Sequence, residues 1–232
     1  MLPLKDTIRS RSFPAVNWLL IIANVFVFVV FELSLPPQRL ERFISTYGLV
    51  PAQLLAGQLQ ALGDVFTSMF LHGGWFHLIS NMWALYIFGD NVEDRMGSGR
   101  YLIFYLICGA AAGVTQSFVS AGSGVPLVGA SGAIAGVLAA YLLLYPNARV
   151  ITLVPIFFLF PFIEIPAVIY LVFWAILQFF NGVLSLAGNA ALGGVAYWAH
   201  IGGFVAGLAL VRLFAHRPYA YYRWYSDEYR PW

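Results

Sequence analysis

Two long stretches of the chain contain almost no ionisable side chains, and this feature restricts the possible folds more than any other. No Lys, Arg, Asp or Glu occurs from Tyr101 to Ala148, and from Ile165 to Val211 the only strongly ionisable residue is His200. Each stretch is long enough for two membrane spans with a loop between them, because one span needs about 20 apolar residues. Over the whole chain only 9% of residues are charged, whereas soluble domains carry about 25%. The sequence therefore predicts an all-α, polytopic membrane protein.

Six helices are expected, separated by segments that contain Pro and Gly. The first is interpreted as a membrane span and not as a signal peptide, because no convincing small-residue cleavage site follows it. The loop at residues 35–64 is long enough for short amphipathic structure on the membrane surface. The expected helices cover residues 15–34, 75–92, 101–120, 131–146, 165–181 and 196–214.

This pattern predicts one six-helix membrane domain at residues 15–214, preceded by a cytoplasmic segment at 1–14. A cytoplasmic tail at 215–232 mixes aromatic and basic residues, and either anchors at the lipid headgroups or is disordered. Residues 150–163 are apolar but too short for a span, and two prolines interrupt them. They either extend the fourth helix or lie at the membrane interface. Glu164, which follows them, is expected at the interface near Arg149.

The basic residues predict the orientation of the helices. With six spans, ten of the twelve Lys and Arg residues fall on the side of the two termini, and only Arg39 and Arg42 fall on the other side. Basic residues accumulate on the cytoplasmic side of membrane proteins, so both termini are expected in the cytoplasm and the protein in a cell membrane. A formal net charge of +2, without a continuous basic patch, excludes nucleic acid as a partner.

Three polar residues are expected at similar depths in three different helices. In the predicted topology His77, Ser131 and His200 each lie near the outer start of a helix that runs inward. A lone membrane Ser or His often only links two helices, but convergence of three favours a functional site. Ser131 opens the fourth helix, whose N-terminal amides can stabilise an oxyanion. His200 can act as the base for its hydroxyl, and no acidic residue in the fourth or sixth helix completes a triad.

Small residues recur every four positions on the fourth and sixth helices. This pattern lets two membrane helices approach closely, which supports a hydrogen bond between Ser131 and His200. The residues are Gly132, Gly136 and Ala140 on the fourth helix, and Ala199, Gly203 and Gly207 on the sixth.

His77 and Asn81 are four residues apart and therefore share one face of the second helix. Both side chains can donate hydrogen bonds, as an oxyanion hole requires. His72 either serves the same region or caps the loop, and the second interpretation is preferred. No metal is expected, because no carboxylate or Cys lies near these residues to complete a zinc site.

Together these residues resemble the motifs of the rhomboid family of intramembrane serine proteases. The resemblance covers about residues 71–214, and Gly89, Glu93 and Gly97 also fit the family pattern. The motifs are His77-x-x-x-Asn81, Gly129-Ala130-Ser131-Gly132, and Ala199-His200-Ile201-Gly202-Gly203.

The resemblance implies a catalytic dyad in which Ser131 is the nucleophile and His200 is the base. It assigns stabilisation of the oxyanion to His77, Asn81 and the backbone N–H of Ser131. It implies no cofactor. The implied partners are the lipid bilayer and the transmembrane segments of substrate proteins, which are cut near the outer face after a small residue.

The chain departs from the family pattern at two places. The first long loop lacks the Trp-Arg pair common in the family, so the usual packing of that loop does not carry over. Ala135 stands four residues after the serine, where many members have an aromatic residue. Stacking of that aromatic ring on the catalytic histidine is therefore not expected here.

Two other functions fit the composition. A non-catalytic rhomboid-like protein would bind membrane helices without cutting them, and the presence of both Ser131 and His200 disfavours it. A transporter or channel would need a polar pathway through the bilayer, whereas the polar residues are expected in the outer third and the inner halves of the helices are expected to be apolar. The uncharged loops at 121–129 and 182–194 are candidates for water access to the site or for its gating.

We expect reporter fusions to place both termini and the loop at 89–100 on one side of the membrane, and the loop at 35–64 on the other. The reason is the asymmetry of ten basic residues against two. A terminus on the same side as residues 35–64 would contradict this topology and the common depth of the three polar residues.

Overall fold

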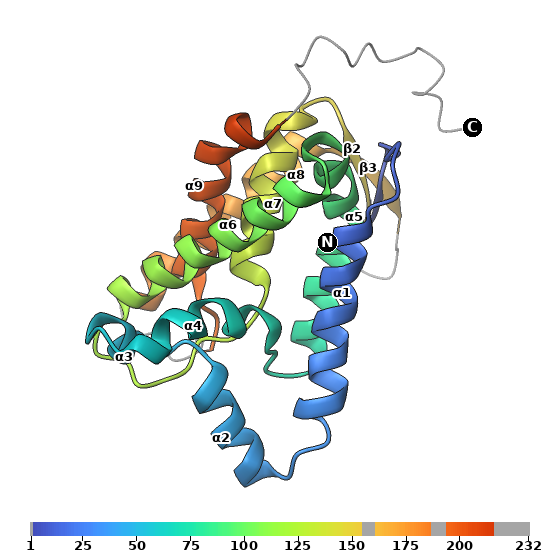
Figure 1. Cartoon of the computed structure of the whole chain (residues 1–232). Coiled ribbons are helices and arrows are strands. Elements are labelled where there is room, and N and C mark those ends of the chain that lie inside the picture. Colours follow the sequence, from blue (N-terminus) through green and yellow to red (C-terminus); the bar gives the residue numbers. More distant parts are fainter. Residues whose placement is uncertain (1, 155–160, 187–193, 216–232) are drawn as a thin grey trace.

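The computed structural model describes residues 2–154, 161–186 and 194–215, and the expected tail lies almost wholly outside them. Long helices dominate the described chain and pack side by side as a bundle (Figure 1). They confirm the helical prediction and begin within a few residues of the expected positions. Their bounds are α1 Ala15–Val27, continued by the π-helical turn η1 Phe28–Glu32, α5 Trp75–Met96, α6 Ser98–Val119, α7 Ser131–Leu144, α8 Ala167–Leu186 and α9 Tyr197–Phe214.

Four stretches of the described chain are long and apolar enough to cross a membrane. They are α1 with η1, α6, α8 and α9. Helix α7 is apolar but only 14 residues long, and α5 carries Asp90, Glu93 and Arg95 in its last two turns. The polytopic helical bundle is thus confirmed, whereas the count of six spans stays a prediction.

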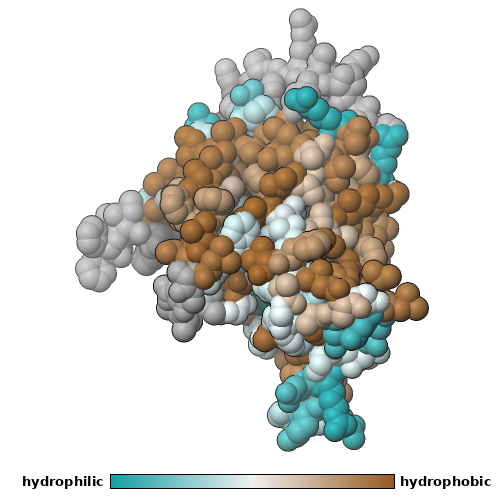
Figure 2. Space-filling view, turned by 90° about the vertical axis from the view of Figure 1, so that its left-hand side faces the viewer, coloured by the Kyte–Doolittle hydropathy of each residue, from teal (hydrophilic) through white to brown (hydrophobic). Residues whose placement is uncertain are grey.

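Short helices fill the loop after the first span, which was expected to be long enough for them. Helix α2, Pro37–Tyr47, has no buried residue and projects from the body at the bottom of Figure 1. Figure 2 shows hydrophobic residues over the middle of one face of the molecule and hydrophilic residues toward its two ends. This distribution suits a protein whose middle faces lipid. The remaining elements of the loop are α3 Pro51–Leu55, α4 Leu59–Thr67 and the 3-10 turn η2 Ser68–Phe70.

A small antiparallel sheet, which the sequence analysis did not anticipate, joins the N-terminal segment to the chain between α7 and α8. Strand order is β1-β2-β3, with β1 at Leu2–Asp6, β2 at Arg149–Leu153 and β3 at Phe162–Pro166. An extension of the fourth helix through residues 149–153 is therefore wrong. The β-branched residues of β2 favour a strand once another strand pairs with them, and the partner β1 lies far away in the sequence. The expected proximity of Glu164 to Arg149 is confirmed, with 3.7 Å between Oε2 and Nη1.

Helix α7 is the central helix of the bundle, and eleven of its fourteen residues are buried. It meets α9 backbone to backbone at the expected small residues. A Cβ atom on Gly203 would lie 1.9 Å from the carbonyl oxygen of Gly132, and one on Gly207 would lie 2.4 Å from that of Gly136. No larger side chain fits at either position, so these glycines set the distance between the two helices.

A cluster of buried polar residues fastens the end of the bundle at which α1 begins. The Glu93 carboxylate accepts the backbone N–H groups of Val16 at 3.1 Å and Asn17 at 2.7 Å, which lie in the first turn of α1. A carboxylate at this position satisfies free N–H groups and suits the helix dipole. Tyr101 donates its hydroxyl hydrogen to the Asn17 side chain at 2.8 Å. In the predicted topology this is the inner end, so the expectation that the inner halves of the helices are apolar is wrong.

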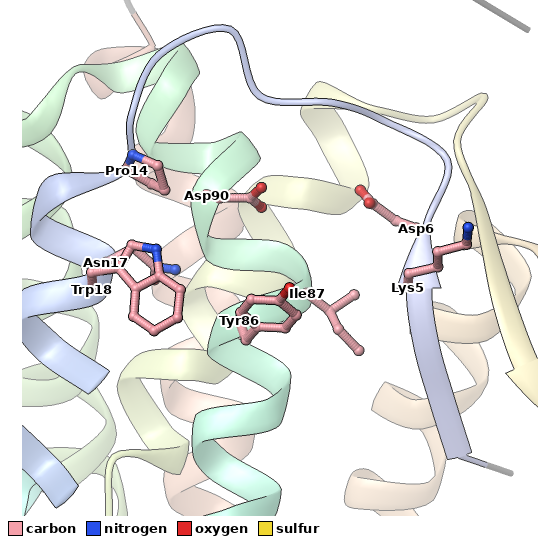
Figure 3. A pocket seen from close by; sticks show the side chains of 8 residues that line it. All are labelled: Lys5, Asp6, Pro14, Asn17, Trp18, Tyr86, Ile87 and Asp90. Carbon is pink, nitrogen blue, oxygen red and sulfur yellow. The ribbon is translucent and has the colours of Figure 1, made fainter. Parts of the chain in front are cut away.

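Strand β1 is tied to the same polar cluster through Asp6. Its carboxylate accepts hydrogen bonds from the Tyr141 hydroxyl and from Asn91 Nδ2. Burial raises the pKa of Asp6 to about 7, against the opposing effect of the Tyr141 hydrogen bond. Figure 3 shows the Asp6 and Asp90 carboxylates pointing toward each other across a pocket of about 150 Å³ between β1, α1 and α5.

We expect Gly203→Ala and Gly207→Ala each to destabilise the protein, because the added methyl group would collide with the α7 backbone. Overpacking a close-packed interior typically costs about 1–3 kcal/mol, and thermal unfolding of the purified protein would measure the loss. Gly99→Ala is the matched control, since a Cβ atom at that helical position meets nothing within 4 Å. An unfolding temperature equal to that of the control would contradict the close contact.

Candidate active site

Ser131 and His200 are brought together from two helices that start at the same end of the bundle. Ser131 is the first residue of α7, and His200 lies in the first turn of α9. Their Oγ and Nε2 atoms are 2.8 Å apart, although 69 residues separate them in the sequence. The side chains are thus within hydrogen-bonding distance at the point where the two glycine-rich helices meet.

The start of α9 is held in place by a side chain that the sequence analysis missed. Gln116 on α6 accepts the backbone N–H of Ala199 through Oε1 at 3.1 Å, and its Nε2 donates to the Ser120 hydroxyl at 2.9 Å. The same N–H also donates to the Ala196 carbonyl at 3.0 Å, so Gln116 shares this hydrogen with the first turn of α9. The contact fixes the backbone immediately before His200.

His77 lies beside the loop that leads into Ser131. Gly129, two residues before the serine, has a φ angle of +125°, which residues other than glycine rarely adopt. A Cβ atom there would also lie 2.6 Å from Cε1 of the His77 ring. The Gly129 N–H donates to the Ser68 carbonyl at 2.9 Å. The loop is therefore fixed between η2 and His77, in a conformation that requires glycine.

Asn81 lies one turn further along α5 than His77, and only 6% of its surface is exposed. Its Nδ2 atom has no hydrogen-bond partner among the described residues. A buried amide donor without a partner is uncommon, because burial without a hydrogen bond is unfavourable. Asn81 therefore has a free donor in the helix that places His77 beside the Ser131 loop.

His72 lies in the loop before α5 and its ring reaches the region of His77, so the structure combines the two interpretations of this residue. Its backbone N–H donates to both oxygens of the Glu32 carboxylate, at 3.0 and 3.1 Å. Its ring packs edge-on against His77, with 5.0 Å between the ring centroids. Burial lowers the pKa of His72 to about 3, with a smaller contribution from His77, so its imidazole is neutral at physiological pH.

Helix α8 contacts the other side of His200, and the sequence analysis missed this contact as well. Gln178 Oε1 lies 2.8 Å from His200 Nδ1. The Trp174 ring lies one turn earlier, with its centroid 5.9 Å from that of His200. The available signal was a pair of amides, Gln178 and Asn181, in the otherwise apolar fifth helix, near the end that the topology places at the depth of Ser131.

A small cavity opens beside Ser131. It has a volume of about 40 Å³, and its walls come from α6, α7, α9 and the segments around Leu49 and Ser68. Glycine and alanine supply eight of the fourteen lining residues, including Gly109, Ala112 and Ala199. The loop at 121–129 borders this region and pairs with Leu49 through Leu127, whereas residues 187–193 of the second candidate loop lie outside the described chain.

A family model described as the Rhomboid domain matches residues 56–217, well over half of the chain. Rhomboid protein 1, mitochondrial, of Saccharomyces cerevisiae is 27% identical over 194 residues, which cover 80% of this chain and 49% of that protein. RHOMBOID-like protein 12, mitochondrial, of Arabidopsis thaliana is 30% identical over 205 residues, which cover 78% of this chain and 57% of that protein. Rhomboid protease GluP of Bacillus subtilis is 37% identical over 131 residues, which cover 56% of this chain and 24% of that protein.

The chain thus spans about half the length, or less, of these curated relatives. The family model includes all of α5 to α9 and therefore both helices that meet at Ser131 and His200. A match over most of the chain, on a helical membrane bundle of the expected kind, shows that this protein belongs to the rhomboid family.

Proposed function

We propose that the protein is a serine endopeptidase that cuts transmembrane segments of other membrane proteins. The observation that carries the proposal is the 2.8 Å separation of Ser131 Oγ and His200 Nε2 at the start of two membrane helices. A serine hydroxyl is a poor nucleophile unless an adjacent base takes its proton, and this geometry supplies the base. One relative, Rhomboid protease GluP, is named as a protease.

In the proposed reaction Ser131 Oγ attacks the carbonyl carbon of the scissile peptide bond while His200 Nε2 takes the hydroxyl proton. The carbonyl oxygen becomes an oxyanion, stabilised by His77, Asn81 and the backbone N–H of Ser131. His200 then gives its proton to the leaving amine, and the C–N bond breaks. A water molecule, activated by the same imidazole, hydrolyses the resulting acyl-enzyme and regenerates Ser131.

The cavity beside Ser131 supports a preference for a small residue before the scissile bond. Its volume of about 40 Å³ and its many glycine and alanine walls leave room for only a short side chain. Helices α5 and α8 expose large apolar side chains, which suits contact with a membrane-embedded substrate or with lipid.

We also propose that the site opens toward the outer side of a cell membrane, with both termini in the cytoplasm. The distribution of basic residues supports this orientation. Two of the relatives carry the word mitochondrial in their names, so fractionation of cells that express a tagged chain is the direct test of the compartment.

The alternative is a non-catalytic family member that binds membrane helices. Reconstitution of the purified protein with a single-pass substrate in lipid vesicles separates the two functions. The substrates tested should carry a panel of different small residues at the cut site. Cleavage that disappears in Ser131→Ala supports the peptidase. Substrate capture with no Ser131-dependent cleavage of any of them supports the binding protein.

Ser131→Ala and His200→Ala should each lower the rate of cleavage by more than about 10³-fold, and the double variant should be scarcely slower than either. Residues that act as one unit show this non-additivity. Ser117→Ala is a matched control, because the buried Ser117 hydroxyl donates only to the Gly113 carbonyl of its own helix. Full activity in a correctly folded Ser131→Ala protein would exclude the serine peptidase mechanism.

Asn81→Ala should lower kcat by up to about 10²–10³-fold, the loss observed when one oxyanion donor is removed from a serine protease. KM should change little, because the donor meets negative charge only as the transition state forms. The unfolding temperature should not fall much, since Asn81 Nδ2 has no partner among the described residues. Ser80→Ala, at the exposed neighbouring position, is the control. A loss of thermal stability together with activity would show instead that Asn81 links helices.

A further inference from the structure

Gln178 is a polar residue on the inward face of an otherwise lipid-facing helix. Only Ala167, Leu171 and Gly182 of α8 are buried, and Gln178 continues their stripe, seven residues after Leu171 and four before Gly182. Its neighbour Leu177 is 41% exposed. A polar side chain in a membrane helix is unfavourable unless it faces the interior and finds a partner there. Gln178 is therefore expected to have a hydrogen-bond partner inside the bundle.

That partner is His200, and the contact completes a continuous chain of three side chains. Gln178 Oε1 is 2.8 Å from His200 Nδ1, and His200 Nε2 is 2.8 Å from Ser131 Oγ. A neutral imidazole carries its single proton on one nitrogen only. An amide oxygen can only accept, so Nδ1 must hold the proton and Nε2 must be free to accept from the serine.

We propose that Gln178 is the positioning residue of the Ser131–His200 pair and selects the tautomer of His200 that can act as a base. The proposal rests on the peptidase function proposed above and extends it from a dyad to three residues. Gln178 touches no reacting atom and acts only through the imidazole.

The packing of α8 against α9 fixes the position of Gln178. One turn after it, the Trp198 indole donates to the Gly182 carbonyl at 3.1 Å, and a Cβ atom on Gly182 would lie 3.2 Å from Ile201. One turn before it, the Trp174 ring lies against His200. Helix α8 therefore contacts the imidazole with an aromatic ring and an amide.

An amide is suited to this position for an electrostatic reason. When Nε2 takes the serine proton, the imidazole becomes a cation, and hydrogen bonds to charged groups are stronger than neutral ones. The negative end of the Gln178 amide dipole then points at Nδ1–H and stabilises the cation. A permanent carboxylate would do the same but would place an ionised group in the membrane, where charge is much less favourable.

The first test compares variants of the full-length protein in lipid vesicles with a single-pass substrate. Gln178→Met keeps the length of the side chain but has no acceptor, so kcat should fall about 10- to 100-fold while KM changes less than about twofold. Leu177→Met, which introduces the same residue on the exposed face of the helix, should keep full activity. Gln178→Glu offers an acceptor in either protonation state and should recover most of the lost rate.

The second test measures the tautomer directly, by ¹⁵N NMR of protein labelled at histidine, above the ordinary imidazole pKa of about 6.5. His200 should show a protonated Nδ1 and an unprotonated Nε2, and Gln178→Met should lose this preference; the His200→Gln spectrum identifies the signals. A wild-type protein protonated at Nε2, or a Gln178→Met protein with full kcat, would overturn the proposal. If the wild type shows no Ser131-dependent cleavage, the peptidase function fails, and the tautomer still decides whether Gln178 orients His200.

Discussion

The backbone contact between α7 and α9 is the constraint on which the candidate site depends. Gly203 lies so close to the Gly132 carbonyl, and Gly207 so close to that of Gly136, that neither position accepts a Cβ atom. Ser131 and His200 begin these same two helices. Because the two helix axes are held together over more than one turn, side chains at their starts meet without any contribution from a flexible loop.

The two ends of the bundle use polar residues in different ways. At the end where α1 begins, Glu93, Asn17 and Tyr101 satisfy one another and the first N–H groups of α1. Such pairing is expected where water cannot replace a missing partner. At the other end the Ser131 hydroxyl faces a small cavity, and the Asn81 Nδ2 atom has no hydrogen-bond partner among the described residues. A free donor near a cavity is typical of a site that receives a ligand or a transition state.

Helix α8 explains how this chain dispenses with an aromatic residue on α7. The family resemblance led us to expect no ring stacked on His200 from position 135, and Ala135 is indeed buried without contributing one. The Trp174 ring and the Gln178 amide approach the imidazole from α8 instead. A large side chain at position 135 is therefore not needed to limit the motion of His200.

The sequence by itself determined the helical membrane fold, the approximate start of each long helix and the close approach of α7 to α9. These features depend on local composition and on residue spacing along one helix, both of which are visible in a linear chain. Only the tertiary structure decided the contacts of Gln178 and Gln116 with α9 and the pairing of β1 with β2. Each of these joins segments far apart in the sequence, and the partner of a polar side chain or of a strand edge depends on how helices rotate and where loops return. Periodicity fixes which residues share a face, whereas packing of the whole bundle decides which faces meet.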